Sequence, residues 1–143
     1  MTALAIHPGT AFGPLRIGMT EQEAIDAMAA LGFEPAPDSG RIWFEQCLMA
    51  EFSLPDARLG FVELSDGRIR GEFDGVDVLA GEQAEIVALF QRVTGEAPRI
   101  EEDGDSVSFA RSGAALWRGG DDERAPGRWE TVAVGAPGSF DPA

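Results

Sequence analysis

The sequence predicts an α+β fold of two tandem β-α-β-β-β units, each with one amphipathic helix packed on an antiparallel sheet. The prediction rests on a repeat, because the segments 20–28 and 81–89 share a Glu-Gln pair and an Ile and an Ala at equal spacing. A glycine, a proline-containing stretch, an acidic turn and short apolar strands follow each segment. In a single domain of 143 residues, we therefore place the units at about 4–73 and 76–135, with a tail at 136–143.

The first unit opens with short apolar segments at about 4–6 and 15–17 and continues into a capped helix. Thr20 and the glutamate three residues later form a capping-box pattern, in which both side chains accept hydrogen bonds from backbone N–H groups at the helix start. The helix is expected over 21–31, because its apolar residues follow helical spacing; they are Ala24, Ile25, Met28 and Leu31. Gly32 then supplies the left-handed conformation that commonly ends a helix.

After this helix the apolar period changes from helical spacing to alternation, which indicates strands. Segments 41–44, 48–52 and 58–64 are expected to form three of them, and turns with Pro, Asp and Gly lie around them. The turn at 65–67 leads into 68–73, which fits either a fourth strand or an irregular link. Alternation along these strands predicts a sheet with one buried and one solvent-facing side.

The second unit repeats this order. A helix is expected over 82–94 and ends at Gly95; the apolar stripe along one face is Ile86, Leu89, Phe90 and Val93. Segments 106–109, 114–117 and 129–134 then read as three strands. Units of about 65 residues would each be marginally stable alone, so we expect them to share a core or a continuous sheet.

A polar, glycine-rich loop over 118–128 separates the last two strands and is expected to project from a hairpin. Trp117-Arg118 and Arg128-Trp129 are near mirror images about this loop. We expect the two pairs to face each other across the strands.

Charge restricts the partners. With 25 acidic and 11 basic residues the formal net charge is −14, which disfavours nucleic acid and anionic membranes and favours a basic protein. An acidic surface that merely maintains solubility is the alternative. Every basic residue is an arginine, and Lys, Asn and Tyr are absent, which suggests a GC-rich bacterial genome.

A cytoplasmic location is expected. No apolar stretch approaches the roughly 20 residues that cross a bilayer, and the first eight residues lack the basic region of a signal peptide. The single cysteine, Cys47, cannot form an internal disulfide, which agrees with a reducing compartment.

The residues give little support to catalysis or to a cofactor. His7 is the one histidine and no nucleophile-elbow motif accompanies it, while Cys47 lies in an apolar run typical of a buried thiol. The acidic clusters at 101–105 and 121–123 lack a complete EF-hand loop, so solvated turns or an acidic docking surface are favoured over a calcium site. We therefore expect no enzyme activity, no cofactor and no metal.

One segment carries a family resemblance. Gly13-Pro14-Leu15-Arg16-Ile17-Gly18-Met19-Thr20, followed by a helix ending at Leu31-Gly32, resembles the Gly-Met-Thr helix start of the BamE-like outer-membrane assembly lipoproteins. It is also similar to the tandem units of the beta-lactamase inhibitory proteins and to small immunity-type bacterial proteins. The resemblance covers about 20 residues and implies a non-enzymatic, protein-binding role.

These observations predict a non-catalytic protein-binding module, most concretely an immunity-type inhibitor that neutralises a basic toxin or enzyme, as a monomer or weak dimer. Trp43, Trp117 and Trp129 lie on expected strands, where an exposed tryptophan is a common partner anchor. The expected partner-binding residues are Trp117, Arg118, Asp121, Asp122, Glu123, Arg128 and Trp129. One alternative is a small-molecule module or enzyme with a pocket between the units, lined by Arg41, Arg68 or Arg70; another is an assembly scaffold.

Overall fold

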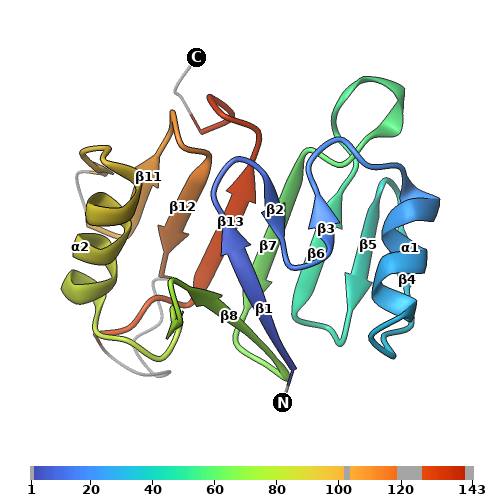
Figure 1. Ribbon diagram of the computed structural model, residues 1–143, viewed down its shortest axis with the longest axis horizontal. Coiled ribbons are helices and arrows are strands. Elements are labelled where there is room, and N and C mark those ends of the chain that lie inside the picture. Colours follow the sequence, from blue (N-terminus) through green and yellow to red (C-terminus); the bar gives the residue numbers. More distant parts are fainter. Residues whose placement is uncertain (1, 102–103, 119–126, 141–143) are drawn as a thin grey trace.

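The computed structural model describes residues 2–101, 104–118 and 127–140, and it shows an α+β fold (Figure 1). Two α-helices, α1 (Glu21–Ala29) and α2 (Gln83–Thr94), accompany two sheets. In spatial order the larger sheet contains β10 (Arg99–Ile100), β11 (Ser106–Phe109), β12 (Ala114–Trp117), β13 (Thr131–Gly135), β7 (Phe61–Ser65), β6 (Leu48–Glu51), β5 (Arg41–Phe44) and β4 (Ala36–Asp38). The smaller sheet contains β3 (Leu15–Arg16), β2 (Ala11–Phe12), β1 (Thr2–His7), β8 (Ile69–Phe73) and β9 (Val76–Asp77).

The larger sheet is antiparallel throughout and joins the two units. Each unit contributes a helix followed by four strands, and the last strands, β7 and β13, pair in the middle with Val62 opposite Val134. Of the two predicted ways to join the units, a shared core or a continuous sheet, the continuous sheet is present. The short edge strands β4 and β10 were not predicted, because two or three residues carry no usable alternation.

Strand β8 belongs with the second unit. The local pattern puts this segment at the end of the first unit, but the strand does not join the larger sheet and pairs in parallel with β1, with Leu4 opposite Gly71. It precedes α2 as β1 precedes α1, so the boundary between units lies in the turn between β7 and β8. A local sequence pattern cannot predict this pairing, because the parallel partner strand lies at the start of the chain, far away in the sequence.

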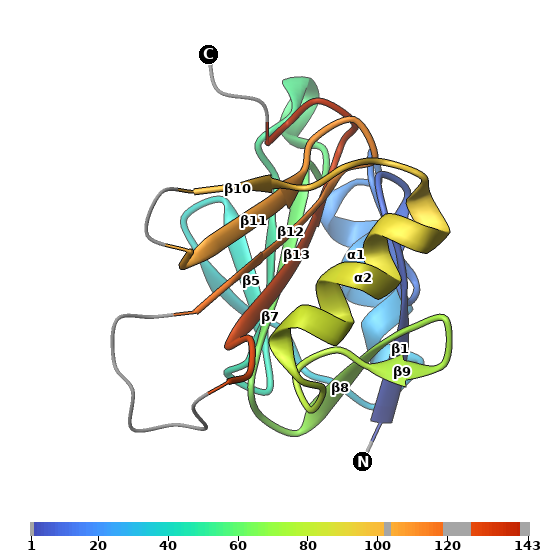
Figure 2. The ribbon, with the colours of Figure 1, turned by 90° about the vertical axis from the view of Figure 1, so that its left-hand side faces the viewer.

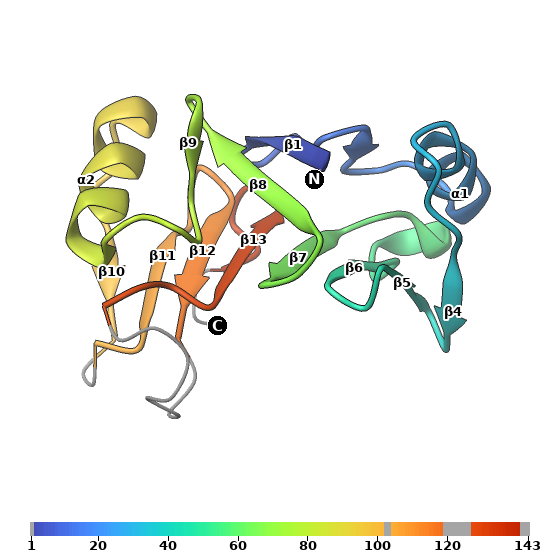
Figure 3. The ribbon, with the colours of Figure 1, turned by 90° about the horizontal axis from the view of Figure 1, so that it is seen from below.

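Figures 1 to 3 show that both helices and the smaller sheet lie on one side of the larger sheet, with the β1–β8 pair between the helices. One cluster of buried side chains runs through this layer and includes Leu4, Met28, Leu64, Phe90 and Val132. The two units therefore share one closed core.

The helices begin as predicted. Thr20 and Glu23 form the capping box, in which Thr20 Oγ1 accepts a hydrogen bond from the Glu23 amide at 3.2 Å and Glu23 Oε1 accepts one from the Thr20 amide at 3.0 Å. Gly95 ends α2 with φ +73°. The predicted apolar stripes continue one turn too far, however. Helix α1 ends at Ala29, and the side chains of Leu31 and Val93 are 45% and 47% exposed.

A stack of three phenylalanines connects the layers. The Phe90 ring on α2 lies 4.1 Å from the Phe73 ring on β8 and 5.5 Å from the Phe109 ring on β11, measured between centroids. Below the β1–β8 pair, a Cβ added at Gly71 would lie 2.9 Å from Leu64 Cδ2, so the close approach of the two sheets leaves little room for a larger residue at this position.

Replacing Phe90 with alanine is expected to lower the free energy of unfolding by about 3–5 kcal/mol, because it removes the middle ring of the stack and leaves a cavity. Urea denaturation measures this change. Val93→Ala, at an exposed position of the same helix, should change the value by less than about 0.5 kcal/mol. Similar losses for the two variants would contradict the assignment of Phe90 to the shared core.

Candidate functional site

The side of the larger sheet that faces away from the helices is here called the open face (Figure 3). Alternation places every second side chain on it, and one cross-strand row contains Trp43, Met49, Glu63, Ala133 and Ala115 in register. No described helix or strand covers this row. The strands at both ends of the sheet bend towards this side in Figures 2 and 3, so the open face is concave.

Two tryptophans flank an apolar floor on the open face. Trp43 in β5 and Trp117 in β12 are each half-buried, and Trp117 stands one row along, opposite Thr131. Between them Met49 is only 6% exposed and Ala133 is fully buried, although both lie outside the main core cluster. Met49, Ala133 and Ala115, which is 3% exposed, are here called the apolar floor. A packed apolar centre beside two half-buried tryptophans suits contact with another protein.

Glu63 lies at the centre of this floor. It is half-buried in β7, and its carboxylate has no hydrogen bond or ion pair with any residue that the structure describes. The pKa of Glu63 is raised above its ordinary value, because burial disfavours the charged carboxylate; the guanidinium of Arg41 opposes this shift, and the carboxylate of Glu51 adds to it. The neighbours of Glu63 on β13 carry no charge.

Ion pairs border the floor on both sides. Arg41 Nε lies 3.0 Å from Glu51 Oε1 beside Trp43, and the Arg118 Nε–Asp105 Oδ1 distance is 2.8 Å beyond Trp117. These side chains are about one-third to one-half exposed, so each pair contributes little to stability. Their main effect is to fix polar groups around the two tryptophans.

The segment 136–140 covers one end of the open face. Phe140 packs on Phe61 of β7 with ring centroids 5.9 Å apart, and a Cβ added at Gly135 would lie 3.2 Å from the Phe140 ring. The Gly138 amide also donates a hydrogen bond to the Ala110 carbonyl at 2.7 Å. Part of the predicted tail is therefore packed on the sheet, and no described helix or strand covers the central row beside it.

The structure separates the predicted partner-binding residues. Trp117 and Arg118 border the open face, whereas Trp129 is 4% exposed and belongs to the main core cluster. Arg128 is exposed outside the open face, beside the start of α2. Asp121, Asp122 and Glu123 lie outside the described residues.

The expected facing of the two tryptophan–arginine pairs is wrong. Trp117 is opposite Thr131, because β13 begins two residues after Trp129. The indole Nε1 of Trp129 donates a hydrogen bond to the Gln83 carbonyl at 3.2 Å, and the Gln83 amide donates one to the Gly127 carbonyl at 2.9 Å. The chain before β13 is thus held by the start of α2 and not by β12.

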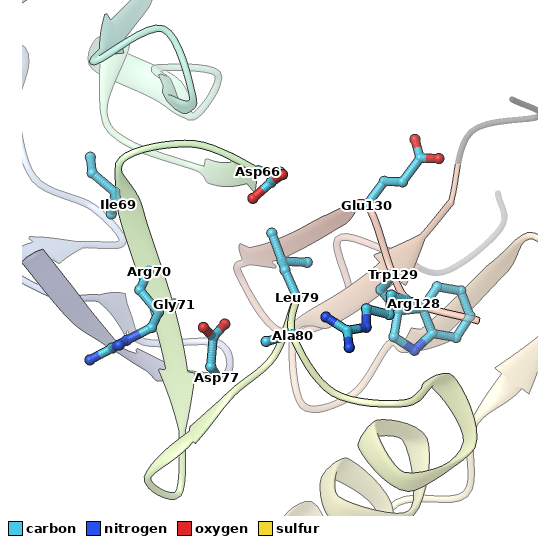
Figure 4. Close-up of a pocket in the computed structure, with 10 residues that line it drawn as sticks. All are labelled: Asp66, Ile69, Arg70, Gly71, Asp77, Leu79, Ala80, Arg128, Trp129 and Glu130. Atoms are coloured by element: carbon cyan, nitrogen blue, oxygen red, sulfur yellow. The ribbon is translucent and has the colours of Figure 1, made fainter. Parts of the chain in front are cut away.

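A cavity of about 180 Å³ lies between β8, the segment after β9 and the chain before β13 (Figure 4). Its lining mixes charges, with Asp66, Asp77 and Glu130 near Arg70 and Arg128. It is smaller than the roughly 300–1,000 Å³ of common ligand sites.

The three arginines proposed for a pocket between the units do not converge. Arg41 pairs with Glu51 on the larger sheet, Arg68 is exposed in the turn before β8, and Arg70 Nε lies 3.1 Å from Glu72 on the smaller sheet. The core between the units is also continuous. This arrangement favours a surface site over an internal pocket.

Among the described residues, no group of three or more His, Cys, Asp or Glu side chains could hold a metal ion. Cys47 is free and buried, and His7 is exposed. None of the described helices is long and apolar enough to cross a membrane.

No protein-family model matches the chain, and no curated protein or solved structure matches it significantly. Glu63 and Met49 are not among the residues predicted for the site, although Glu63 is the one acidic residue in the apolar stretch 59–64 and this contrast was an available signal.

Replacing Glu63 with glutamine is expected to stabilise the fold increasingly as pH rises. The raised pKa means that the wild-type protein loses stability as pH increases from the unfolded-state value through the folded-state value. The Tm difference should be near zero at about pH 4 and reach about 1–3 °C at about pH 7 by calorimetry. Glu85→Gln removes the same charge from the exposed side of α2 and should not reproduce this increase; a flat profile for Glu63→Gln would contradict the desolvation of Glu63.

Proposed function

We propose that this chain is a non-catalytic protein-binding module that binds its partner on the open face, most concretely an immunity-type inhibitor of a basic toxin or enzyme. The observation that carries the proposal is the pair of half-buried tryptophans around a shielded apolar floor. Aromatic side chains around a well-packed, desolvated centre are typical of the residues that dominate protein interfaces.

Net charge supports a basic partner. A formal charge of −14 on 143 residues attracts a positively charged protein over a distance and raises its association rate, an effect that salt weakens. Long-range attraction brings the partner to the protein, and contacts on the open face then hold it. Affinity should therefore fall with ionic strength mainly through slower association.

A cytoplasmic, bacterial setting is part of the same proposal. The free and buried Cys47 is compatible with a reducing compartment, and the absence of Lys, Asn and Tyr fits a GC-rich genome. An inhibitor of this kind works at one-to-one stoichiometry and needs no cofactor.

The double variant Trp43→Ala/Trp117→Ala is expected to weaken partner binding by about 100-fold or more, because it removes both aromatic anchors. The partner is first captured from a lysate of the source organism at low salt and identified by mass spectrometry. Affinity is then measured with the purified protein by calorimetry, and circular dichroism checks that the variant is folded.

Leu31→Ala/Val93→Ala is the matched control, since it removes two exposed apolar side chains from the helical side of the molecule. It should bind like the wild type. If the tryptophan variant keeps wild-type affinity, or the control loses as much, the open face is not the binding surface. Loss of toxicity when the captured protein is co-expressed with this chain would support the inhibitor role.

A further inference from the structure

Glu63 occupies the most central position that the open face offers. It is in β7, the fourth strand from one end of the eight-stranded sheet, and the central pairing places it opposite Ala133. On its other side Met49 separates it from Trp43, which is about 10 Å away at the usual strand spacing. Trp117 stands two strands away on the opposite side.

Several other carboxylates of the described residues already have partners. Glu51 and Asp105 are paired with arginines at the border of the floor. Glu96 is held at a turn, where Ser112 donates hydrogen bonds to its Oε1 from the backbone amide at 2.8 Å and from the hydroxyl at 2.7 Å. Glu23 serves the capping box.

Glu63 differs from these residues because it is desolvated without such compensation within the described part of the chain. A half-buried carboxylate without a partner is costly, and a neutral residue of similar size would avoid the cost. Arg41, whose charge acts on Glu63, is itself paired with Glu51. Groups of this kind tend to be found where a ligand completes the interaction.

We propose that Glu63 is the receptor for an arginine side chain of the protein partner. This inference rests on the proposed function and names the partner group that the open face selects. Both carboxylate oxygens are available among the described contacts, so a guanidinium can bind them with two parallel hydrogen bonds. The half-buried tryptophans on either side would shield the ion pair from water, and the packed apolar floor keeps water from its inner side.

The direct test uses a small probe, the peptide acetyl-Gly-Arg-Gly-amide, with its citrulline counterpart as a neutral control of the same shape. Glu63 carboxyl and tryptophan indole signals are followed by NMR during titration. At millimolar concentrations the arginine peptide should shift the Glu63 carboxyl and the Trp43 and Trp117 indole signals and should lower the apparent pKa of Glu63. The citrulline peptide should shift them much less, and Glu63→Gln should abolish the difference. Equal shifts for both peptides, or no shift of the Glu63 carboxyl, would overturn the inference.

The partner itself supplies the second test. Glu63→Gln should weaken its binding by about 30-fold, the change expected when one member of a buried charge pair is neutralised. Glu85→Gln, which removes one negative charge from α2, should weaken it less than about twofold. If the tryptophan variant fails to bind and Glu63→Gln binds like the wild type, the open face is the interface and the arginine receptor is wrong. If the tryptophan variant binds normally, the proposed function itself fails.

Discussion

The antiparallel pairing of β7 with β13 is the contact on which the rest of this molecule depends. It joins two four-strand halves into one sheet and fixes Val62 opposite Val134 and Glu63 opposite Ala133. Units of about half the chain would each bury too little apolar surface to be stable alone. Through this pairing the core under α1 and the core under α2 become one, and the β1–β8 pair closes it above the central strands.

The same pairing creates the open face. Since side chains alternate along a strand, the register that buries Val62 and Val134 in the core necessarily turns Glu63 and Ala133 to the opposite side. A residue in the middle of an eight-stranded sheet is partly desolvated by its neighbours even where no second layer covers it. The carboxylate of Glu63 is therefore half-buried because of its position in the fold, and that position makes it suitable as a specific contact.

Charge acts on two length scales in the proposed function. The formal net charge of −14 acts over roughly a Debye length and affects which proteins approach and how fast. Pairing at Glu63 acts within hydrogen-bond distance, and its strength depends on excluding water. The packed 136–140 segment limits the site at one end, so an approaching partner meets the tryptophans and the central row.

Local features of the chain were readable from the sequence. Neighbouring residues and composition predict the capping box at Thr20, the glycine that ends α2, the α+β class and a sheet shared by the units, and the structure agrees with each of them. The acidic charge follows from composition alone. The tertiary structure alone decided which side each strand presents and which strand pairs with which. β8 pairs with β1 across more than 60 residues, and Trp129 donates a hydrogen bond at the start of α2 and does not lie opposite Trp117. These outcomes depend on the packing of distant segments. The local sequence therefore identifies Glu63 only as an acidic residue in a strand, whereas the fold places it at the centre of a surface.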